Sequence, residues 1–214
     1  MRLALSRIHF PVTTLGPGRR IGIWFQGCSI RCEGCISRDT WRFREGDVMP
    51  DDVVQRLAPW LDECDGVTIS GGEPFDQAAA LFELLKRIKA HKSTANVLVY
   101  SGYGLARLDA YQELRTGLID TLITDPYVRD ADQTKNLRGS DNQQLHCLTE
   151  LGEAVFARCE RHLSDADKNL DVMFDDDGTV WLAGIPRKGD MTLLAALLRE
   201  NGHVAHITEA PRLV

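Results

Sequence analysis

Three cysteines lie close enough together in the chain to bind one metal centre. Cys28, Cys32 and Cys35 occur in the segment CSIRCEGC, separated first by three residues and then by two. Thiolates are soft ligands that suit zinc or an iron–sulfur cluster. A structural zinc site takes four protein ligands and a cubane cluster has four irons, so three cysteines leave one position open. That position is either a missing ligand or the place where a second molecule binds.

A zinc site of three cysteines and one histidine is the first alternative. His91, His146 and His162 lack the short spacing to the cysteines that zinc modules usually show. The spacing therefore favours an iron–sulfur cluster. Buried structural thiols are the expectation for the three cysteines without paired spacing, which are Cys64, Cys147 and Cys159.

Length and composition describe an ordinary globular chain. The 214 residues suffice for one domain with a core, and 43% hydrophobic with 26% charged residues argues against disorder. A net charge of −6 gives no basic footprint for nucleic acid. We expect neither a signal peptide at MRLALSRIHF nor a membrane span, which needs about 18 consecutive apolar residues. Clustered cysteines then indicate metal binding in a reducing cytoplasm rather than disulfides.

Short apolar runs alternate with amphipathic segments in the first half of the chain. This alternation predicts βαβ units and a parallel sheet. Small or polar residues follow the first three strands directly, at the edge where parallel α/β folds and barrels bind their ligands. The expected strands are 21–25, 66–70, 96–101 and 118–124, and the expected helices are 50–61, 76–89 and 105–116. Residues 127–144 are polar and predict an irregular segment.

A second motif, SGGEPF, follows the second expected strand. Gly71 and Gly72 would let the backbone approach a ligand closely, and the carboxylate of Glu73 suits an ammonium group. Alone, the glycine pair would indicate only a tight turn. Its position one strand after the cysteines favours a shared binding site.

Together these two motifs resemble the radical S-adenosylmethionine (radical SAM) enzymes. In that family, SAM chelates the fourth iron of a [4Fe-4S] cluster through its amino and carboxylate groups. The resemblance implies that the reduced cluster cleaves SAM to methionine and a 5′-deoxyadenosyl radical, with the protein holding both groups. It also implies a partial (β/α) barrel within the α/β fold class, and a low-potential electron donor of flavodoxin or ferredoxin type.

Four further segments narrow the resemblance to the activating proteins of anaerobic ribonucleotide reductase. These proteins generate glycyl radicals on partner enzymes. The similarity covers roughly residues 5–148. The segments are GPGRR (Gly16–Arg20), GCSIRCEGCISRDTW (Gly27–Trp41), YSGY (Tyr100–Tyr103) and RGSDNQ (Arg138–Gln143). Two alternatives stay open: hydrogen abstraction from a small molecule, nucleotide or peptide, and a non-catalytic iron–sulfur or zinc protein.

The resemblance assigns roles to individual residues and no catalytic side chain beyond them. It places the cluster on Cys28, Cys32 and Cys35. The implied SAM-binding residues are Gly71, Gly72, Glu73 and Pro74 at the methionine end, Ser101, Gly102 and Tyr103 near the adenosyl group, Asp125 near the ribose, and Arg138, Ser140, Asn142 and Gln143 near the carboxylate or substrate. The chain departs from the family after Asp125, where Pro126-Tyr127 follow at once. The residue that holds the SAM carboxylate is therefore not identified.

The chain continues for 71 residues after Gln143, further than these activating proteins extend. We expect a radical SAM core over 1–148 and a C-terminal extension over 149–214 that packs on it and narrows the site. The expected extension is a helix (145–163), a hairpin around Asp175–Asp177 (170–184) and a helix (190–202) followed by HVAHI. The apolar hairpin residues expected to be buried are Val172, Phe174, Val180 and Leu182.

Overall fold

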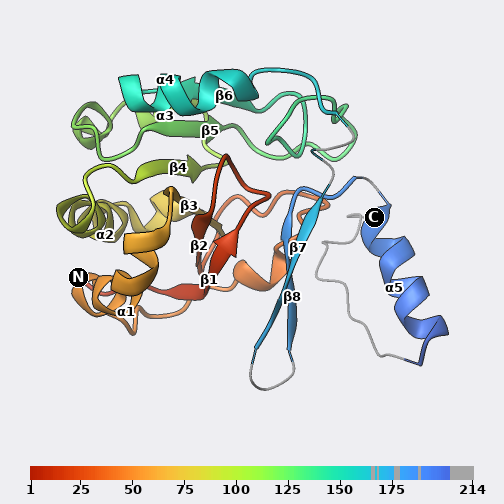
Figure 1. The fold of residues 1–214 in the computed structure, drawn as a ribbon. Helices are drawn as coiled ribbons and strands as arrows, with labels where there is room; N and C mark the ends of the chain where they lie inside the picture. The colour runs from red at the N-terminus through yellow and green to blue at the C-terminus, as the bar shows by residue number, and fades with distance from the viewer. Residues whose placement is uncertain (165–166, 168, 176–178, 188, 203–214) are drawn as a thin grey trace.

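Six strands form one sheet whose spatial order follows the chain from β1 to β6 (Figure 1). The computed structural model describes residues 1–164, 167, 169–175, 179–187 and 189–202. β2, β3, β4 and β5 are parallel, and β1 and β6 add antiparallel edges. The strands are β1 (Leu5–Val12), β2 (Arg20–Phe25), β3 (Gly66–Gly71), β4 (Asn96–Tyr100), β5 (Thr121–Thr124) and β6 (Gln144–Cys147).

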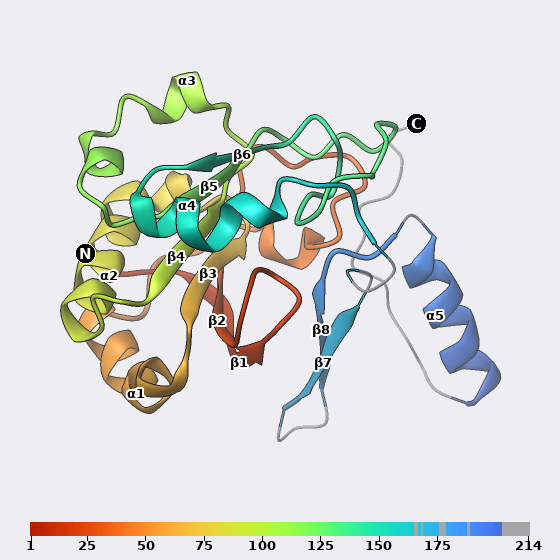
Figure 2. The same ribbon diagram turned by 45° about the horizontal axis from the view of Figure 1, so that its top comes forward.

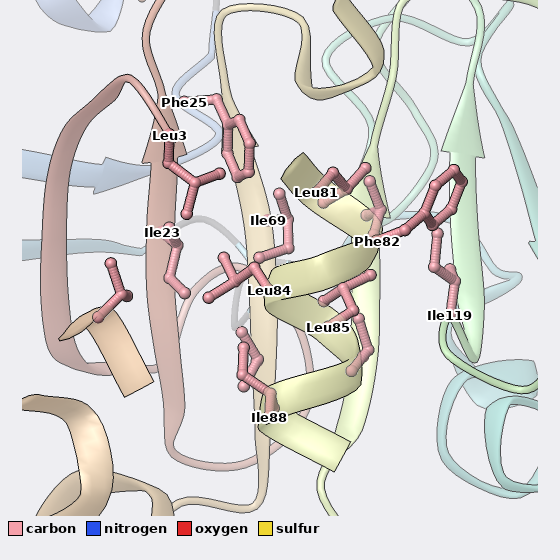
Figure 3. Packing of buried hydrophobic residues seen from close by; sticks show 14 of the residues in the cluster. Leu3, Ile23, Phe25, Ile69, Leu81, Phe82, Leu84, Leu85, Ile88 and Ile119 are labelled. Atoms are coloured by element: carbon pink, nitrogen blue, oxygen red, sulfur yellow. The ribbon is translucent and has the colours of Figure 1, made fainter. Parts of the chain in front are cut away.

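Helices cover both faces of this sheet. α1 and α2 pack on one face, where Leu81, Leu84 and Leu85 point from α2 toward Ile23 and Ile69 (Figure 3). On the opposite face, Phe156 of α4 is fully buried with Leu98 and Ile123. The α-helices of this core are α1 (Pro50–Glu63), α2 (Ala78–His91), α3 (Leu105–Leu108) and α4 (Glu150–Phe156). Short 3-10 helices are η1 (Arg38–Thr40), η2 (Pro74–Gln77), η3 (Gln112–Arg115) and η4 (Ala157–Cys159).

The predicted α/β class and parallel sheet are confirmed, but two predicted helices are not. The helix expected over 145–163 is wrong, because Leu145 lies on β6, which pairs antiparallel with β5. α4 begins only after Thr149, whose hydroxyl accepts the N–H of Gly152 and caps the helix. The helix expected over 105–116 is reduced to α3 and η3. Because β1 and β6 are separate edges of the sheet, the strand order does not confirm a partial barrel.

β7 and β8 form a second, two-stranded antiparallel sheet beside the β1 end of the first (Figures 1 and 2). The carboxylate of Asp171 accepts hydrogen bonds from the backbone and hydroxyl groups of Thr13 and Thr14, at 2.6–3.1 Å. α5 lies beyond this pair in both views. The elements are β7 (Leu170–Phe174), β8 (Val180–Gly184) and α5 (Asp190–Glu200).

The apolar face of this pair was predicted wrongly. Val172, Phe174 and Val180 are 52%, 76% and 50% exposed. The opposite face, with Met173 and Ala183, packs on a small cluster of β1 and β2 residues. Both faces carry apolar side chains, and the bonds of Asp171 fix which one turns inward. The hairpin tip at Asp176–Asp177 and the HVAHI segment lie outside the described residues.

None of the helices among the described residues combines the length and the apolar character needed to cross a membrane.

Candidate functional site

A cavity of about 740 Å³ lies at the carboxyl ends of the parallel strands. Each strand from β2 to β5 contributes residues directly after its last position, as expected for a binding site in a parallel α/β fold. The structure therefore brings together most of the residues singled out from the sequence. Those that line the cavity are Cys28, Cys32, Cys35, Gly71, Gly72, Glu73, Ser101, Gly102, Asp125 and Gln143.

The cysteine loop is closed at its base by two backbone hydrogen bonds. Gly27 N–H donates to the Thr40 carbonyl at 2.7 Å, and Cys28 N–H donates to the Trp41 carbonyl at 3.2 Å. A side-chain contact adds to this closure, because the Asp76 carboxylate accepts the N–H of Ser29 at 2.7 Å. The loop is thus fixed at both ends of the segment that carries the three thiols.

Burial and hydrogen-bond donors act in opposite directions on the three thiols. Burial raises the pKa of Cys32 to about 11 and also raises the pKa of Cys28 and of Cys35. N–H groups that point at each sulfur act in the opposite direction, because they stabilise the thiolate. These donors are the backbone N–H groups of Ile30 and Arg31 at Cys28, of Tyr127 at Cys32 and of Ser37 at Cys35, and the indole of Trp41 at Cys35.

The three thiols share one cavity without forming a compact ligand group. Among the residues that the structure describes, no three His, Cys, Asp or Glu side chains gather closely enough to hold one metal ion. A cubane cluster binds each thiolate through a different iron, so its cysteines stand apart around a shared space. Cys28, Cys32 and Cys35 are free thiols and all three line one cavity, so they could share a group bound there.

Backbone packing explains the glycine pair after β3. A Cβ on Gly71, whose φ is +107°, would lie 2.4 Å from the Phe25 N, and one on Gly72 would lie 2.0 Å from the Gly27 carbonyl oxygen. Both positions therefore require glycine for the β3 turn to pack against the start of the cysteine loop. The glycine motif and the cysteine motif are physically joined here.

Glu73 is the buried carboxylate of the site, with 1% exposure. Its carboxylate accepts hydrogen bonds from the N–H of Phe75 at 3.0 Å, the hydroxyl of Ser101 at 2.9 Å and the N–H of Gly102 at 2.8 Å. Burial raises its pKa to about 7, although these three donors oppose that rise. Glu73 therefore joins the ends of β3 and β4 and titrates near neutral pH.

Asp125 is held in an unusual backbone conformation at the end of β5. Its φ of +78° lies in the left-handed region, which is strained for a residue other than glycine. The Asp125 N–H donates to the Tyr103 carbonyl at 3.2 Å, and its carboxylate accepts from the Thr124 hydroxyl at 2.8 Å. Such strain is common at functional sites, and this residue borders the cavity.

The RGSDNQ segment holds the chain after Asp125 in place. The Gln143 amide donates to the Asp125 carbonyl at 3.2 Å, and the Asn142 amide donates to the Pro126 carbonyl at 2.8 Å. The Ser140 hydroxyl accepts the N–H of Val128 at 3.1 Å. In this way the segment fixes the turn that brings the Tyr127 N–H to the Cys32 sulfur.

Five residues predicted from the resemblance lie off the cavity lining in the structure. Arg138 is 1% exposed and forms an ion pair with Glu160, away from the thiols. Tyr103 donates its hydroxyl to Asp76 at 2.6 Å, below the cysteine loop. Pro74 begins η2. The five are Pro74, Tyr103, Arg138, Ser140 and Asn142.

Two contributors to the site were missed in the sequence. The carboxylate of Asp76 binds Ser29 and Tyr103 and so supports the cysteine loop. Trp41 lines the cavity beside Cys35. Neither residue shows a periodic or spacing signal, although Asp76 lies just after the SGGEPF motif and Trp41 ends the cysteine segment.

The C-terminal residues supply an outer wall of the same cavity. Trp181, Ile185 and Met191, from β8 to α5, line it. The Arg7 guanidinium lies 4.4 Å from the ring centre of Trp181 and 5.6 Å from that of Trp24, so it connects β8 to β2. These C-terminal residues therefore bound part of the cavity that the thiols also line.

Comparisons with known proteins agree with this site. Residues 14–146 match the family of 4Fe-4S single cluster domains. An anaerobic ribonucleoside-triphosphate reductase-activating protein of Vibrio cholerae is 30% identical over 149 residues, which are 66% of this chain and 96% of the relative. The proteins of that name from Escherichia coli K12 and phage T4 are 32% and 30% identical, covering 65% and 63% of this chain and 96% and 88% of the relatives.

These matches place the chain first among proteins with a single 4Fe-4S cluster domain. Within that class, the chain belongs to the family of anaerobic ribonucleoside-triphosphate reductase-activating proteins. The family match ends at residue 146, so β7, β8 and α5 lie beyond it.

Proposed function

We propose that this protein is a radical SAM enzyme that carries one [4Fe-4S] cluster on Cys28, Cys32 and Cys35 and binds SAM at the iron left without a protein ligand. The observation that carries the proposal is the shared cavity. The thiols, the glycine turn after β3 and the carboxylates of Glu73 and Asp125 all line it. Its volume of about 740 Å³ lies within the range of cofactor sites.

When bound, the two groups supply reductive cleavage of SAM into methionine and a 5′-deoxyadenosyl radical, which takes a hydrogen atom from the substrate and becomes 5′-deoxyadenosine. The chain's own residues hold and orient these groups. Gly71 and Gly72 permit close approach to the backbone, and Glu73 offers its carboxylate to the methionine ammonium. Asp125 faces the same cavity at the end of β5, where it would bind the ribose hydroxyls.

The family favours a glycyl-radical enzyme as the substrate. The matched relatives are named as activating proteins of anaerobic ribonucleoside-triphosphate reductase. We propose that this chain likewise generates a glycyl radical on a partner of that kind. The electron then comes from a low-potential donor of flavodoxin or ferredoxin type.

A second candidate is hydrogen abstraction from a small molecule, nucleotide or peptide. The observation that favours it is the outer wall at Trp181, Ile185 and Met191, which bounds the cavity beyond the family match. A bounded cavity excludes water and protects a reactive intermediate. A loop delivered by a large partner would have to enter past this wall.

The cluster assignment is tested by a triple substitution. Anaerobically reconstituted protein in which Cys28, Cys32 and Cys35 are all changed to Ala should lose its iron and its cluster absorbance completely. The matched control changes the other three cysteines, Cys64, Cys147 and Cys159, to Ala and should keep both. A full iron content in the first variant would disprove the assignment.

The reaction is tested with the intact, reconstituted protein. After reduction, it should convert SAM to methionine and 5′-deoxyadenosine, detected by chromatography. Addition of an anaerobic ribonucleotide reductase should then produce a glycyl radical in the electron paramagnetic resonance spectrum. SAM cleavage without that radical would favour the small-substrate candidate, and no cleavage would disprove radical SAM chemistry.

A further inference from the structure

One buried polar group beside the cysteines has no role in the function proposed above. The indole N–H of Trp41 is enclosed and makes no hydrogen bond of ordinary geometry within the described part of the chain. A buried tryptophan N–H normally finds an acceptor. The Cys35 sulfur lies close enough for the Trp41 indole to act against the rise in the pKa of that thiol, although the pair falls outside the geometry of an ordinary hydrogen bond. The unsatisfied donor therefore lies beside a predicted cluster ligand.

The cysteine loop itself holds the backbone that carries this indole. The backbone N–H of Trp41 donates to the Arg38 carbonyl at 3.1 Å, while the Trp41 carbonyl accepts from the Cys28 backbone N–H at 3.2 Å. The neighbouring Thr40 carbonyl accepts from Gly27 N–H at 2.7 Å. Trp41 is thereby held at the closure of the loop, and its ring borders the cavity with the thiols.

We propose that the Trp41 indole N–H donates a hydrogen bond to the iron-bound Cys35 sulfur and thereby raises the reduction potential of the cluster. Ligation converts the thiol to a thiolate, which is a stronger acceptor. A donor at a ligand sulfur stabilises the reduced cluster more than the oxidised one, because the reduced form carries one more negative charge. The higher potential would ease electron transfer from the low-potential donor to the cluster, and it would lower the driving force for transfer from the cluster to SAM.

Trp41 differs from the other donors at the thiols because it acts through a side chain. Ile30, Arg31, Ser37 and Tyr127 act through backbone N–H groups, which substitution does not remove. Trp41 is thus the position at which the sequence can adjust the potential without changing a ligand. This inference rests on the proposed function only for the cluster, not for SAM cleavage or for the partner.

The test is a redox titration of the reconstituted full-length protein, followed by electron paramagnetic resonance. Trp41→Phe removes the N–H and keeps an aromatic ring. We expect about a tenfold lower ratio of reduced to oxidised cluster at a fixed potential, equivalent to about 59 mV for one electron. The matched control is Trp60→Phe, which removes an indole N–H from the surface of α1 and should leave the midpoint unchanged. An unchanged midpoint in a fully loaded Trp41→Phe protein would overturn the proposal.

A second measurement uses the wild-type protein, because the Trp41→Phe protein could fail to assemble a cluster. Protein labelled with ¹⁵N in its indole rings should show a ¹⁵N coupling to the reduced cluster by electron–nuclear double resonance. The coupling should persist in Trp24→Phe, because Trp24 is the other core tryptophan at the cavity. Its absence from wild-type protein, or its loss in Trp24→Phe, would overturn the role of Trp41. Absence of any cluster in wild-type protein would instead disprove the proposed function.

Discussion

A buried charged side chain lies at each end of the parallel strands, and the surroundings of the two side chains differ. Arg20 begins β2 and is fully buried at the amino ends of β2, β3 and β4. Glu73 follows β3 and is 1% exposed at the carboxyl ends. Each side chain ties neighbouring strands together. Only Glu73 borders a cavity.

The Arg20 guanidinium has hydrogen-bond acceptors for all of its nitrogen atoms. Its guanidinium donates to the Thr68 hydroxyl at 2.6 Å, to the Asn96 amide oxygen at 2.6 Å and to the Val67 carbonyl at 2.8 Å, and it lies over the Phe156 ring. Burial lowers its pKa to about 10, so it stays charged at neutral pH. The guanidinium is enclosed by its partners at this end of the sheet, so the charge of Arg20 contributes to the stability of the fold.

Glu73 keeps a raised pKa of about 7 despite three hydrogen-bond donors, because burial penalises its charged form. The protonation state of Glu73 therefore depends on the charge of a group bound in the cavity. A cation there would stabilise the carboxylate. The difference teaches that burial alone does not identify a functional charge. The informative combination is burial, a perturbed pKa and an adjacent cavity.

Among substitutions that test the difference between Arg20 and Glu73, the largest effect is expected from replacing Arg20. Arg20→Met leaves Thr68, Asn96 and several carbonyls without their donor in the core, so it should lower the free energy of unfolding by about 2–5 kcal/mol. Denaturant titration of the cluster-free protein measures this. The control is Arg19→Met, because Arg19 is exposed and makes surface contacts, an ion pair with Glu63 at 3.5 Å and a cation–π contact with Phe10. A loss below about 1 kcal/mol would contradict the structural role of Arg20.

The second effect is a pH dependence of stability that arises from Glu73. The folded protein binds the Glu73 proton more tightly than the unfolded chain, since the pKa rises from 4.5 to about 7. The contribution of Glu73 to the free energy of unfolding should therefore be fully present at pH 4.5 and below, and it should be lost as the pH rises to about 7. The contribution of this group is about 3 kcal/mol.

Glu73→Gln should remove this part of the pH dependence from the cluster-free protein. Unfolding measured at several pH values on both proteins isolates the difference, whatever constant offset the substitution adds. Asp76→Asn is the matched control, because it alters the adjacent carboxylate of the same turn without removing Glu73. Identical pH profiles for Glu73→Gln and wild type would show that Glu73 does not titrate in this range.

The strand ends show how much of the site the sequence could predict. In a parallel sheet, the backbone topology alone brings the residues after consecutive strands to one edge. Cys28, Gly72, Ser101 and Asp125 each follow a recognisable apolar strand, so their convergence could be predicted without knowing any side-chain direction. The same reasoning predicted α2 correctly, because its leucine stripe faces the sheet.

The irregular segments limited the prediction for a physical reason. Arg138 lies in a loop without periodicity, and its direction depends on an ion pair with Glu160, a residue distant in sequence. The β7–β8 pair has apolar side chains on both faces. Strand alternation therefore predicts which residues share a face, but it does not predict which face is buried. Contacts from Asp171 to the Thr13–Thr14 turn decide that choice, and no local pattern reports them.

The third prediction asks whether the open end of the sheet binds a cation. If Glu73 binds the SAM ammonium, Glu73→Gln should weaken SAM by about 1–3 kcal/mol while the cluster remains. A spectroscopic titration of the reconstituted protein with SAM measures this, and iron content confirms the cluster. Arg20→Lys is the control from the closed end, where folded protein should bind SAM with unchanged affinity. Unchanged affinity in Glu73→Gln would mean that Glu73 only joins β3 to β4.

The smallest effect is expected at the outer wall, where the cavity meets the C-terminal residues. Trp181 lines the cavity and stacks on Arg7, so Trp181→Ala should open the space in front of the cluster and cost about 1 kcal/mol of stability. The cluster of the reconstituted protein should then lose iron several-fold faster to a soluble chelator, followed by absorbance. Phe174→Ala is the matched control, since Phe174 is 76% exposed on the opposite face of the same strand pair and should change neither quantity. Equal rates of iron loss in Trp181→Ala and wild type would show that access to the cluster does not depend on this wall, and the small-substrate candidate would lose its support.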